Sequence, residues 1–272
     1  MELPVSPQSY TESPDALIRA VKRVDVILAR MAADETDLDV ATAMTNPDRR
    51  DVPLVNFATD VRLPEDHEPS DVLDCIEEHF RQAGCVCRML SSNESQWPLP
   101  LAEQISSLGY RNEKRWVYRL TGYTRPELLV DSLQIIPARA AYNLLHDFFK
   151  QATIEQDSED DGFANDRAAT LIDHLDEPRN EAFLGRINGQ SAGFVSLVSL
   201  GQIGVIDKVH TRLSSSGQDV TTTLLAHAID HCQRAQFETV ITEIADGQAS
   251  TGLFERIGFR PVISFDRYIR DD

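Results

Sequence analysis

The amino-acid sequence predicts an α/β protein with a mixed β-sheet flanked by helices, built as two consecutive halves. Residues 203–259 read as a strand, a glycine-containing loop, a long helix, a second strand and a short helix that ends in Gly258-Phe259. Residues 182–200 read as a β-hairpin, because Asn188-Gly189 is typical of a type I′ turn between two apolar runs. The order helix, strand, helix ending in glycine and an aromatic residue, strand also occurs around Gly109-Tyr110. A chance match between unrelated α/β segments is the alternative to an internal duplication.

In the first half, short apolar runs alternate with helix signals. Ser70 is a good N-cap for a helix whose apolar residues recur at helical spacing and which Gly84 ends. Residues 24–31 fit a strand or a short helix equally well. The other elements we expect here are a loose polar tail over 1–14, an extended segment over 52–63, strands over 85–90 and 114–120, and a helix over 99–108.

The turn-rich stretch 122–126 separates the halves, so we expect domains at 1–125 and 126–272. One face of the long helix is predicted to be buried, because apolar residues recur there at helical spacing: Val220, Leu224, Leu225, Ala228, Ile229 and Cys232. The other expected elements are strands over 133–136, 182–187, 190–200, 203–211 and 237–244, and helices over 137–151, 166–175 and 248–257. The first of these helices has an apolar face that includes Ala141, Leu144, Leu145 and Phe148.

Composition narrows the classes of function. The chain has 272 residues, 42% of them hydrophobic, and a formal net charge of −18. Binding to nucleic acid or to anionic membranes needs clustered Lys and Arg, so this charge argues against both and favours amines and basic peptides as partners. No apolar run indicates a signal peptide or a transmembrane helix. The four cysteines lack metal-ligand spacing, so we expect reduced thiols in a cytoplasmic protein and no metal. The sequence leaves the oligomeric state open.

A polar loop from Ser214 to Asp219 contains Gly217 and opens the long helix directly after a strand. This arrangement offers backbone N–H groups and the positive helix end to a phosphate. An ordinary strand–helix crossover has the same local pattern, so both interpretations stay open. The corresponding stretch before Ser70 is acidic and lacks glycine, so we do not expect the first half to hold a pyrophosphate.

Two motifs resemble those of the GNAT superfamily of acetyl-CoA-dependent N-acetyltransferases. They are Ser216-Gly217-Gln218-Asp219-Val220-Thr221 at the start of the long helix and Leu253-Phe254-Glu255-Arg256-Ile257-Gly258-Phe259 at the end of the short one. The resemblance covers about residues 131–270, and the first half only faintly. It implies a GNAT-like, mostly antiparallel sheet in two tandem halves, acetyl-CoA as co-substrate, and transfer to a primary amine of a small molecule or peptide. It places the cofactor between the strands at 205–211 and 239–244, against Val209, Thr211, Ser216, Gly217, Gln218, Asp219, Val220, Thr221 and Phe254.

Several positions depart from the motifs of the family. Ser216 stands where Gln or Arg is usual, and Asp219 and Thr221 stand where glycines are usual. Phe254 replaces a tyrosine that often serves as general acid. Asp219 would bring a negative charge towards a phosphate. We expect Asp219 to N-cap the helix with its carboxylate turned onto the backbone, which would reduce this repulsion without abolishing it. Two functions therefore remain: an N-acetyltransferase, and a GNAT-fold protein without catalysis that acts as a binding or scaffolding module.

Asp207 and His210 are the candidate catalytic residues. The resemblance places their strand along the cofactor, where the Asp207 carboxylate could take a proton from an amine. A strand carboxylate paired with a nearby Lys or Arg is the alternative. Strand alternation puts His210 on the opposite face, so we do not expect the two to act together. Tyr268 or Ser250 could replace the missing acid.

Two further features have a functional and a structural interpretation. His227 and His231 lie four residues apart on the long helix, so they could share a metal, but a solvated helix face explains them as well. The acidic run 155–161 could attract a cationic acceptor by its field or act as a solvated linker.

Overall fold

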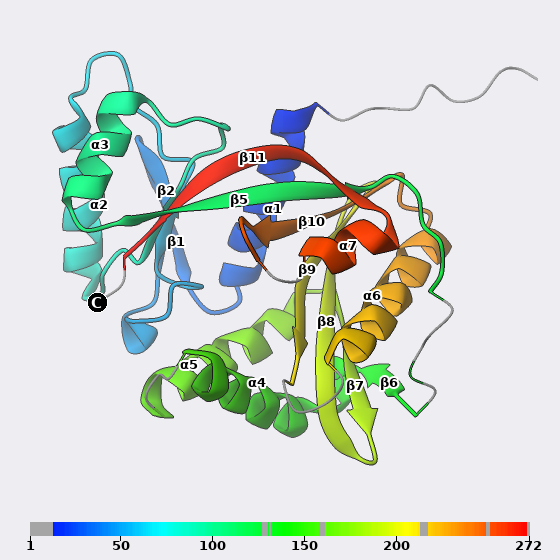
Figure 1. The fold of residues 1–272 in the computed structure, drawn as a ribbon. Coiled ribbons are helices and arrows are strands. Elements are labelled where there is room, and N and C mark those ends of the chain that lie inside the picture. Colours follow the sequence, from blue (N-terminus) through cyan, green and yellow to red (C-terminus); the bar gives the residue numbers. More distant parts are fainter. Residues whose placement is uncertain are drawn as a thin grey trace, which may run out of the picture.

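The computed structural model describes residues 13–126, 130, 132–157, 161–212, 217–248 and 251–270 (Figure 1). Most of the predicted tail, the loop residues Ser214 to Ser216 and the candidate acid Ser250 lie outside this range, as does the middle of the acidic run. None of the helices that the structure describes is long and apolar enough to span a membrane.

The described strands form one eleven-stranded sheet of order β1-β2-β3-β4-β11-β5-β10-β9-β8-β7-β6. All neighbours pair antiparallel except β3 with β4 and β10 with β9. The predicted α/β class with a mixed, mostly antiparallel sheet is therefore confirmed. The strands are β1 Asp34–Leu38, β2 Ala41–Thr45, β3 Phe57–Thr59, β4 Met89–Ser91, β5 Arg111–Leu120, β6 Gln134–Pro137, β7 Asn180–Ile187, β8 Gln190–Leu200, β9 Ile203–Thr211, β10 Thr239–Ala245 and β11 Phe259–Ile269.

The sheet runs across the expected domain boundary. Strand β5 comes from the first half of the chain, yet it lies between β10 and β11 of the second half. In turn, the end of β11 pairs with β4 of the first half. Figure 1 shows β5 and β11 side by side along their length. The division at residue 125 stays a prediction, and any two units that it separates share backbone hydrogen bonds.

Helices cover both faces of this sheet. Helix α1 packs on the face that carries Val198 and Val205, whereas α6 and α7 pack on the face that carries Leu197 and Ile206. These faces are opposite because successive strand residues point to opposite sides. Helices α2 and α3 cover the first-half end, and α4 and α5 pack together against β7 and β8. The α-helices are α1 Pro14–Ala29, α2 Pro69–Ala83, α3 Leu99–Ser107, α4 Tyr142–Asp157, α5 Asp161–Asp173, α6 Gly217–Arg234 and α7 Thr251–Ile257, with short 3-10 helices at Pro47–Arg49, Ala138–Ala140 and His174–Asp176.

Several local predictions are confirmed. Asn188 and Gly189 have φ values of 51° and 82°, as a type I′ turn between β7 and β8 requires. All six residues of the predicted apolar face of α6 are fully buried. Gly84 ends α2 in the left-handed conformation.

Other local predictions are corrected, and one open choice is decided. Residues 24–31, for which a strand and a short helix were both open, are mostly helix, because α1 begins at Pro14 with Ser13 as its cap. Helix α2 is capped by Glu68 in a capping box with Asp71, so Ser70 is not the N-cap. Leu144 is exposed, whereas the adjacent Leu145 is buried in the core. The segments expected to be extended over 52–63 and 85–90 shorten to the three-residue strands β3 and β4, and the hairpin of β1 and β2 was not predicted.

Gly258 lies at the junction of α7 and β11, with φ of 118°. A Cβ atom there would lie 1.5 Å from the carbonyl oxygen of Gly122. We therefore expect Gly258→Ala to destabilise the protein by at least about 3 kcal/mol in urea unfolding. Gly201→Ala is the control, because Gly201 also has a positive φ of 61° but has open space around its Cβ position. That control is expected to cost only about 1 kcal/mol. Equal costs for the two variants would show that close contact with Gly122 is unimportant.

Candidate functional site

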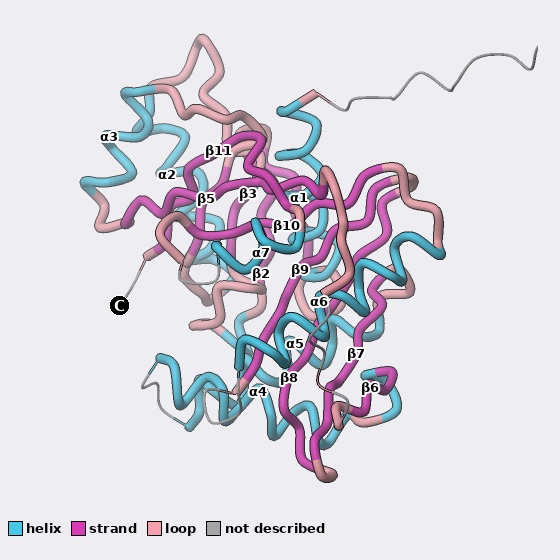
Figure 2. Tube along the Cα trace, turned by 45° about the vertical axis from the view of Figure 1, so that its right-hand side comes forward, coloured by secondary structure: helices cyan, strands magenta, loops and turns pink. Residues whose placement is uncertain are grey.

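The central feature of the site is the separation of two neighbouring parallel strands. β9 and β10 pair only from Ile203 with Thr239 to Ile206 with Thr242. Beyond this point β10 continues along β5, while β9 continues along β8 to Thr211. Figures 1 and 2 show the two strands leaving each other, β9 towards α4 and β10 along β5. Among the described residues, the edge of β9 that faces β10 has no strand partner after Ile206.

A cavity of about 400 Å³ occupies this gap. Its walls come from β9, β10, β5, the first turns of α6, the loop after β10, and α7. It is lined by Arg115, Asp207, Lys208, Val209, His210, Thr211, Thr221, Thr242, Glu243, Ile244, Gln248 and Phe254. The cavity therefore lies between the two strands where the sequence predicts a cofactor.

A β-bulge interrupts β9 where it lines the cavity. Across the β8–β9 pair, Ser196 lies opposite Lys208 and Leu197 lies opposite Ile206, so Asp207 is an extra residue on β9. The bulge breaks the strict alternation on which the sequence prediction depended. All five residues of β9 from 207 to 211 line the cavity, Asp207 and His210 among them. That these two residues do not act together stays a prediction.

Asp207 forms an ion pair with Lys208, the next residue on the strand. Their side chains are 13% and 19% exposed, so both charges lie mostly within the protein. The pairing that the sequence offered as the structural alternative for Asp207 is therefore present. It does not remove the carboxylate from the cavity, because both residues line it.

A buried network of ion pairs forms the inner wall on the α1 side. Glu243 accepts hydrogen bonds from Arg115 at 2.6 Å and from Arg267 at 3.2 Å, and Arg267 also donates to Asp25 at 3.0 Å. Burial alone would raise the pKa of Glu243, but Arg267 and Arg115 together lower it to about 2. Burial raises the pKa of Asp25, helped by the charge of Glu243 and opposed by Arg267. Glu243 is thus a fixed negative charge held between two guanidinium groups.

A second, small cavity of about 40 Å³ lies beyond Lys208, which lines both cavities. His174 lines it with a buried Nε2 atom that has no hydrogen-bond partner among the described residues. Burial, and after it the charges of Lys208 and Arg49, lowers the pKa of His174 well below its usual value, so the ring is neutral at neutral pH. First-half residues complete the apolar part of its lining: Leu28, Pro53, Leu54, Phe57 and Met89.

The residues predicted to contact a cofactor are spread around the larger cavity. Val209, Thr211, Thr221 and Phe254 line it, and the hydroxyl groups of Thr211 and Thr221 lie 3.1 Å apart. Gly217 begins α6, with Gln218 next to it, whereas Ser216 lies outside the described residues. The side chain of Val220 is fully buried in the core, so only its backbone is left for a ligand.

Asp219 is the third residue of α6 and is exposed. The helix begins two residues earlier, so the expectation that Asp219 is the N-cap was wrong. As an acidic residue in the first turn, it interacts favourably with the positive end of the helix.

Three other candidates have structural roles. Tyr268 is buried in the first-half core with its ring 5.2 Å from that of Trp97, and it does not line the cavity. His227 packs edge-on against Phe183 at 4.6 Å, and His231 contacts Glu181 at 2.9 Å. In the part of the chain that the structure describes, no group of three or more His, Cys, Asp or Glu residues could hold a metal ion.

Residues 139–259 match the family described as "Acetyltransferase (GNAT) family". No curated protein matches the chain. Among solved structures, a GCN5-related N-acetyltransferase from Kribbella flavida is similar at 12% identity and a TM-score of 0.59, covering 94% of this chain and 96% of that one. A tandem GNAT protein from the clavulanic acid biosynthesis pathway is similar at 13% identity and a TM-score of 0.54, covering 97% and 96%.

A conserved protein of unknown function from Staphylococcus epidermidis is similar at 14% identity and a TM-score of 0.60, covering 89% of this chain and 95% of that one. At these identities the similarities show a shared fold over nearly the whole chain.

The ion network predicts how stability depends on pH. The folded-state pKa of Glu243 lies below its ordinary value of 4.5, so its charge adds stability above about pH 4.5 that is lost as the pH falls towards 2. We expect Glu243→Gln to lower the free energy of unfolding by about 3 kcal/mol at pH 7. The difference from wild type should narrow as the pH falls below 4.5 in urea titrations.

Glu78→Gln is the matched control. Glu78 also pairs with an arginine, Arg81, at 2.5 Å, but on the exposed surface of α2. Water screens that pair, so its removal is expected to change stability far less. A difference between wild type and Glu243→Gln that stays constant down to pH 3 would contradict the network as described.

Proposed function

Since residues 139–259 carry a GNAT acetyltransferase domain, we propose that this protein is an acetyl-CoA-dependent N-acyltransferase acting on a primary amine of a small molecule or peptide. The observation that carries the proposal is the cavity between the separating strands β9 and β10, which lies beside the start of α6. We also propose that the chain is divided near residue 125 into two GNAT-like units, with this cavity in the second. The likeness to a tandem GNAT protein over 97% of the chain supports that division.

The chain offers suitable groups for the two polar parts of coenzyme A. The edge of β9 from Asp207 to Thr211 has no partner strand on the β10 side among the described residues, and its backbone N–H and C=O groups suit the amide groups of a pantetheine arm. The first N–H groups of α6, from Gly217 on, have no partner within the helix itself, and such groups suit a pyrophosphate. Asp219 opposes this binding by its charge, and Thr221 replaces a small residue with a hydroxyl donor.

Asp207 is the proposed general base. Acyl transfer needs a group that removes a proton from the attacking nitrogen, donors for the oxyanion and a thiolate that leaves. Asp207 lines the cavity, where it forms an ion pair with Lys208. Backbone N–H groups of β9 between Val209 and Thr211 are the proposed oxyanion donors. His210 lines the same cavity as a second candidate for proton transfer.

In this proposal the thiolate leaves without being protonated by a tyrosine. Phe254 occupies the position where the family often has that tyrosine, and its ring packs 5.7 Å from that of Phe259.

The acceptor amine is proposed to approach from the α1 side, where Asp25 and His174 line the small cavity behind Lys208.

The four cysteines are free thiols, which supports a reducing, cytoplasmic location.

A GNAT-fold binding module without catalysis is the second candidate. The exposed carboxylate of Asp219 in the first turn of α6, together with Phe254 in place of a tyrosine, favours it. The two candidates differ in turnover rather than in fold.

Calorimetric titration with acetyl-CoA, followed by thiol release in the presence of a panel of primary amines, tests the proposed function. We expect binding and amine-dependent thiol release, with Asp207→Asn lowering kcat/KM by about 100-fold or more. Asp37→Asn, the same change on an exposed residue of β1, is the control and should leave kcat/KM unchanged. Binding without thiol release for any amine would favour the binding module, and loss of both would refute the proposal.

The charge of Asp219 predicts a gain in affinity when it is removed. Asp219→Asn keeps the shape of the side chain and removes one negative charge beside the proposed pyrophosphate site, so acetyl-CoA should bind about 5-fold more tightly or better. The gain should shrink at high salt, because Asp219 is exposed.

Glu238→Gln removes the same charge just beyond the far end of α6, about 25 Å away, and should leave the affinity unchanged. Weaker binding by Asp219→Asn than by wild type would mean that the carboxylate orders the loop instead of repelling the ligand.

A further inference from the structure

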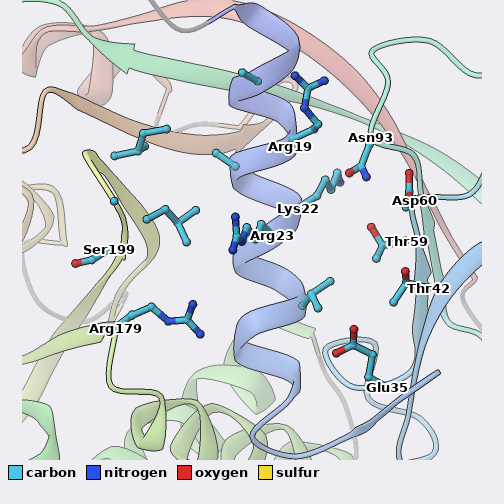
Figure 3. Close-up of a pocket in the computed structure, with 16 residues that line it drawn as sticks. Arg19, Lys22, Arg23, Glu35, Thr42, Thr59, Asp60, Asn93, Arg179 and Ser199 are labelled. Carbon is cyan, nitrogen blue, oxygen red and sulfur yellow. The ribbon is translucent and has the colours of Figure 1, made fainter. Parts of the chain in front are cut away.

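A groove of about 690 Å³ lies on the α1 side of the molecule and shares no lining residue with the cavity between β9 and β10. Helix α1 forms its floor, with the small side chains of Ala16 and Ala20. One wall carries Thr42 and Thr59 of the first-half strands, and the other is the turn between β8 and β9 (Figure 3). Its volume lies within the range of ordinary small-molecule sites.

The groove is locally basic in a chain with a net charge of −18. Arg19 and Arg23 are exposed residues of α1 that line it, and within the described residues neither makes a hydrogen bond or an ion pair. The other charged residues that line the groove, Lys22 excepted, are paired. Arg179 pairs with Glu177 at 2.6 Å, Glu35 accepts a hydrogen bond from Arg30 at 2.8 Å, and Asp60 lies 3.9 Å from Arg62.

Lys22 adds a third positive group at the inner wall. Its side chain extends from α1 towards the wall that carries Asn93 and Thr59 (Figure 3). It is only 1% exposed, and its Nζ atom has no hydrogen-bond partner among the described residues. The ammonium group lies 4.0 Å from the centre of the Phe265 ring. A buried ammonium without an acceptor costs free energy, which an anionic oxygen in the groove would recover.

The surroundings of Lys22 lower the pKa of its ammonium group. Burial foremost, and then the positive charge of Arg267, lowers the pKa of Lys22 to about 7, against the opposing effects of Glu243 and Asp25. An anion beside this group would favour its protonated form.

We propose that this groove is a binding site for a small anionic molecule, recognised through carboxylate or phosphate oxygens by Arg19, Arg23 and Lys22. Hydroxyl and amide groups around the groove, from Thr42, Thr59 and Asn93, supply further donors for such oxygens. The two unpaired guanidinium groups lie one turn apart on the helix, so they can contact one multivalent ligand together. The site is distinct from the proposed acetyl-CoA cavity and does not depend on acyl transfer.

Calorimetric titrations with pyrophosphate and with citrate test this proposal on the full-length protein. The two probes separate phosphate from carboxylate ligands. Arg23→Glu is expected to weaken binding of the preferred probe by about 10-fold or more. Arg50→Glu is the matched control, because Arg50 is exposed and lies outside the groove while the net charge changes equally. It should change the affinity by less than about 2-fold.

Lys22→Met provides a second variant. Removal of an ammonium without a hydrogen-bond partner should leave the thermal midpoint unchanged or higher, while anion binding weakens. No measurable binding of either probe to wild type would overturn the proposal. Equal losses in Arg23→Glu and Arg50→Glu would also overturn it, since they would show a general charge effect.

Discussion

The separation of β9 from β10 after Ile206 and Thr242 is the constraint on which the rest of the site depends. The bulge at Asp207 lies immediately after the last paired residue of β9, and bulges bend and twist the strand that carries them. β10 stays with β5, so the two strands cannot close again. The gap leaves a strand edge that has no strand partner among the described residues, places α6 with its amino terminus beside it, and forms a cavity that Asp207 and His210 line.

Charged side chains are buried beside the gap in the sheet, where they are removed from water. They form ion pairs with one another instead. Arg115, Glu243 and Arg267 come from three adjacent strands, and Glu243 pairs with both arginines behind the cavity. Asp25 of α1 completes the network, which ties the first helix of the chain to its last strand. Such buried pairs contribute little net stability compared with apolar packing, but breaking one is costly. The network therefore fixes the relative positions of α1, β5, β10 and β11 around the cavity.

Local patterns sufficed for a large part of this architecture. The turn at Asn188-Gly189 and the buried face of α6 follow from periodicity and from residues with special backbone preferences. The position of the cavity is the one that the resemblance to the GNAT superfamily implies for a cofactor. The bulge at Asp207 could not be predicted, because it arises from the register with β8. The ion network joins Asp25, Arg115, Glu243 and Arg267 across the whole chain, and only the tertiary fold brings them together. A charged residue inside an apolar strand, such as Glu243, was the one available sequence signal.

Hydrogen exchange measured by mass spectrometry, with and without saturating acetyl-CoA, tests the central claim most directly. If the gap between β9 and β10 is the cofactor site, exchange should slow along residues 207–211, where β9 no longer pairs with β10, and in the first turns of α6. Residues 52–90 of the first half should exchange at unchanged rates. Protection confined to those first-half residues or to α1, or no protection anywhere at saturation, would contradict the account.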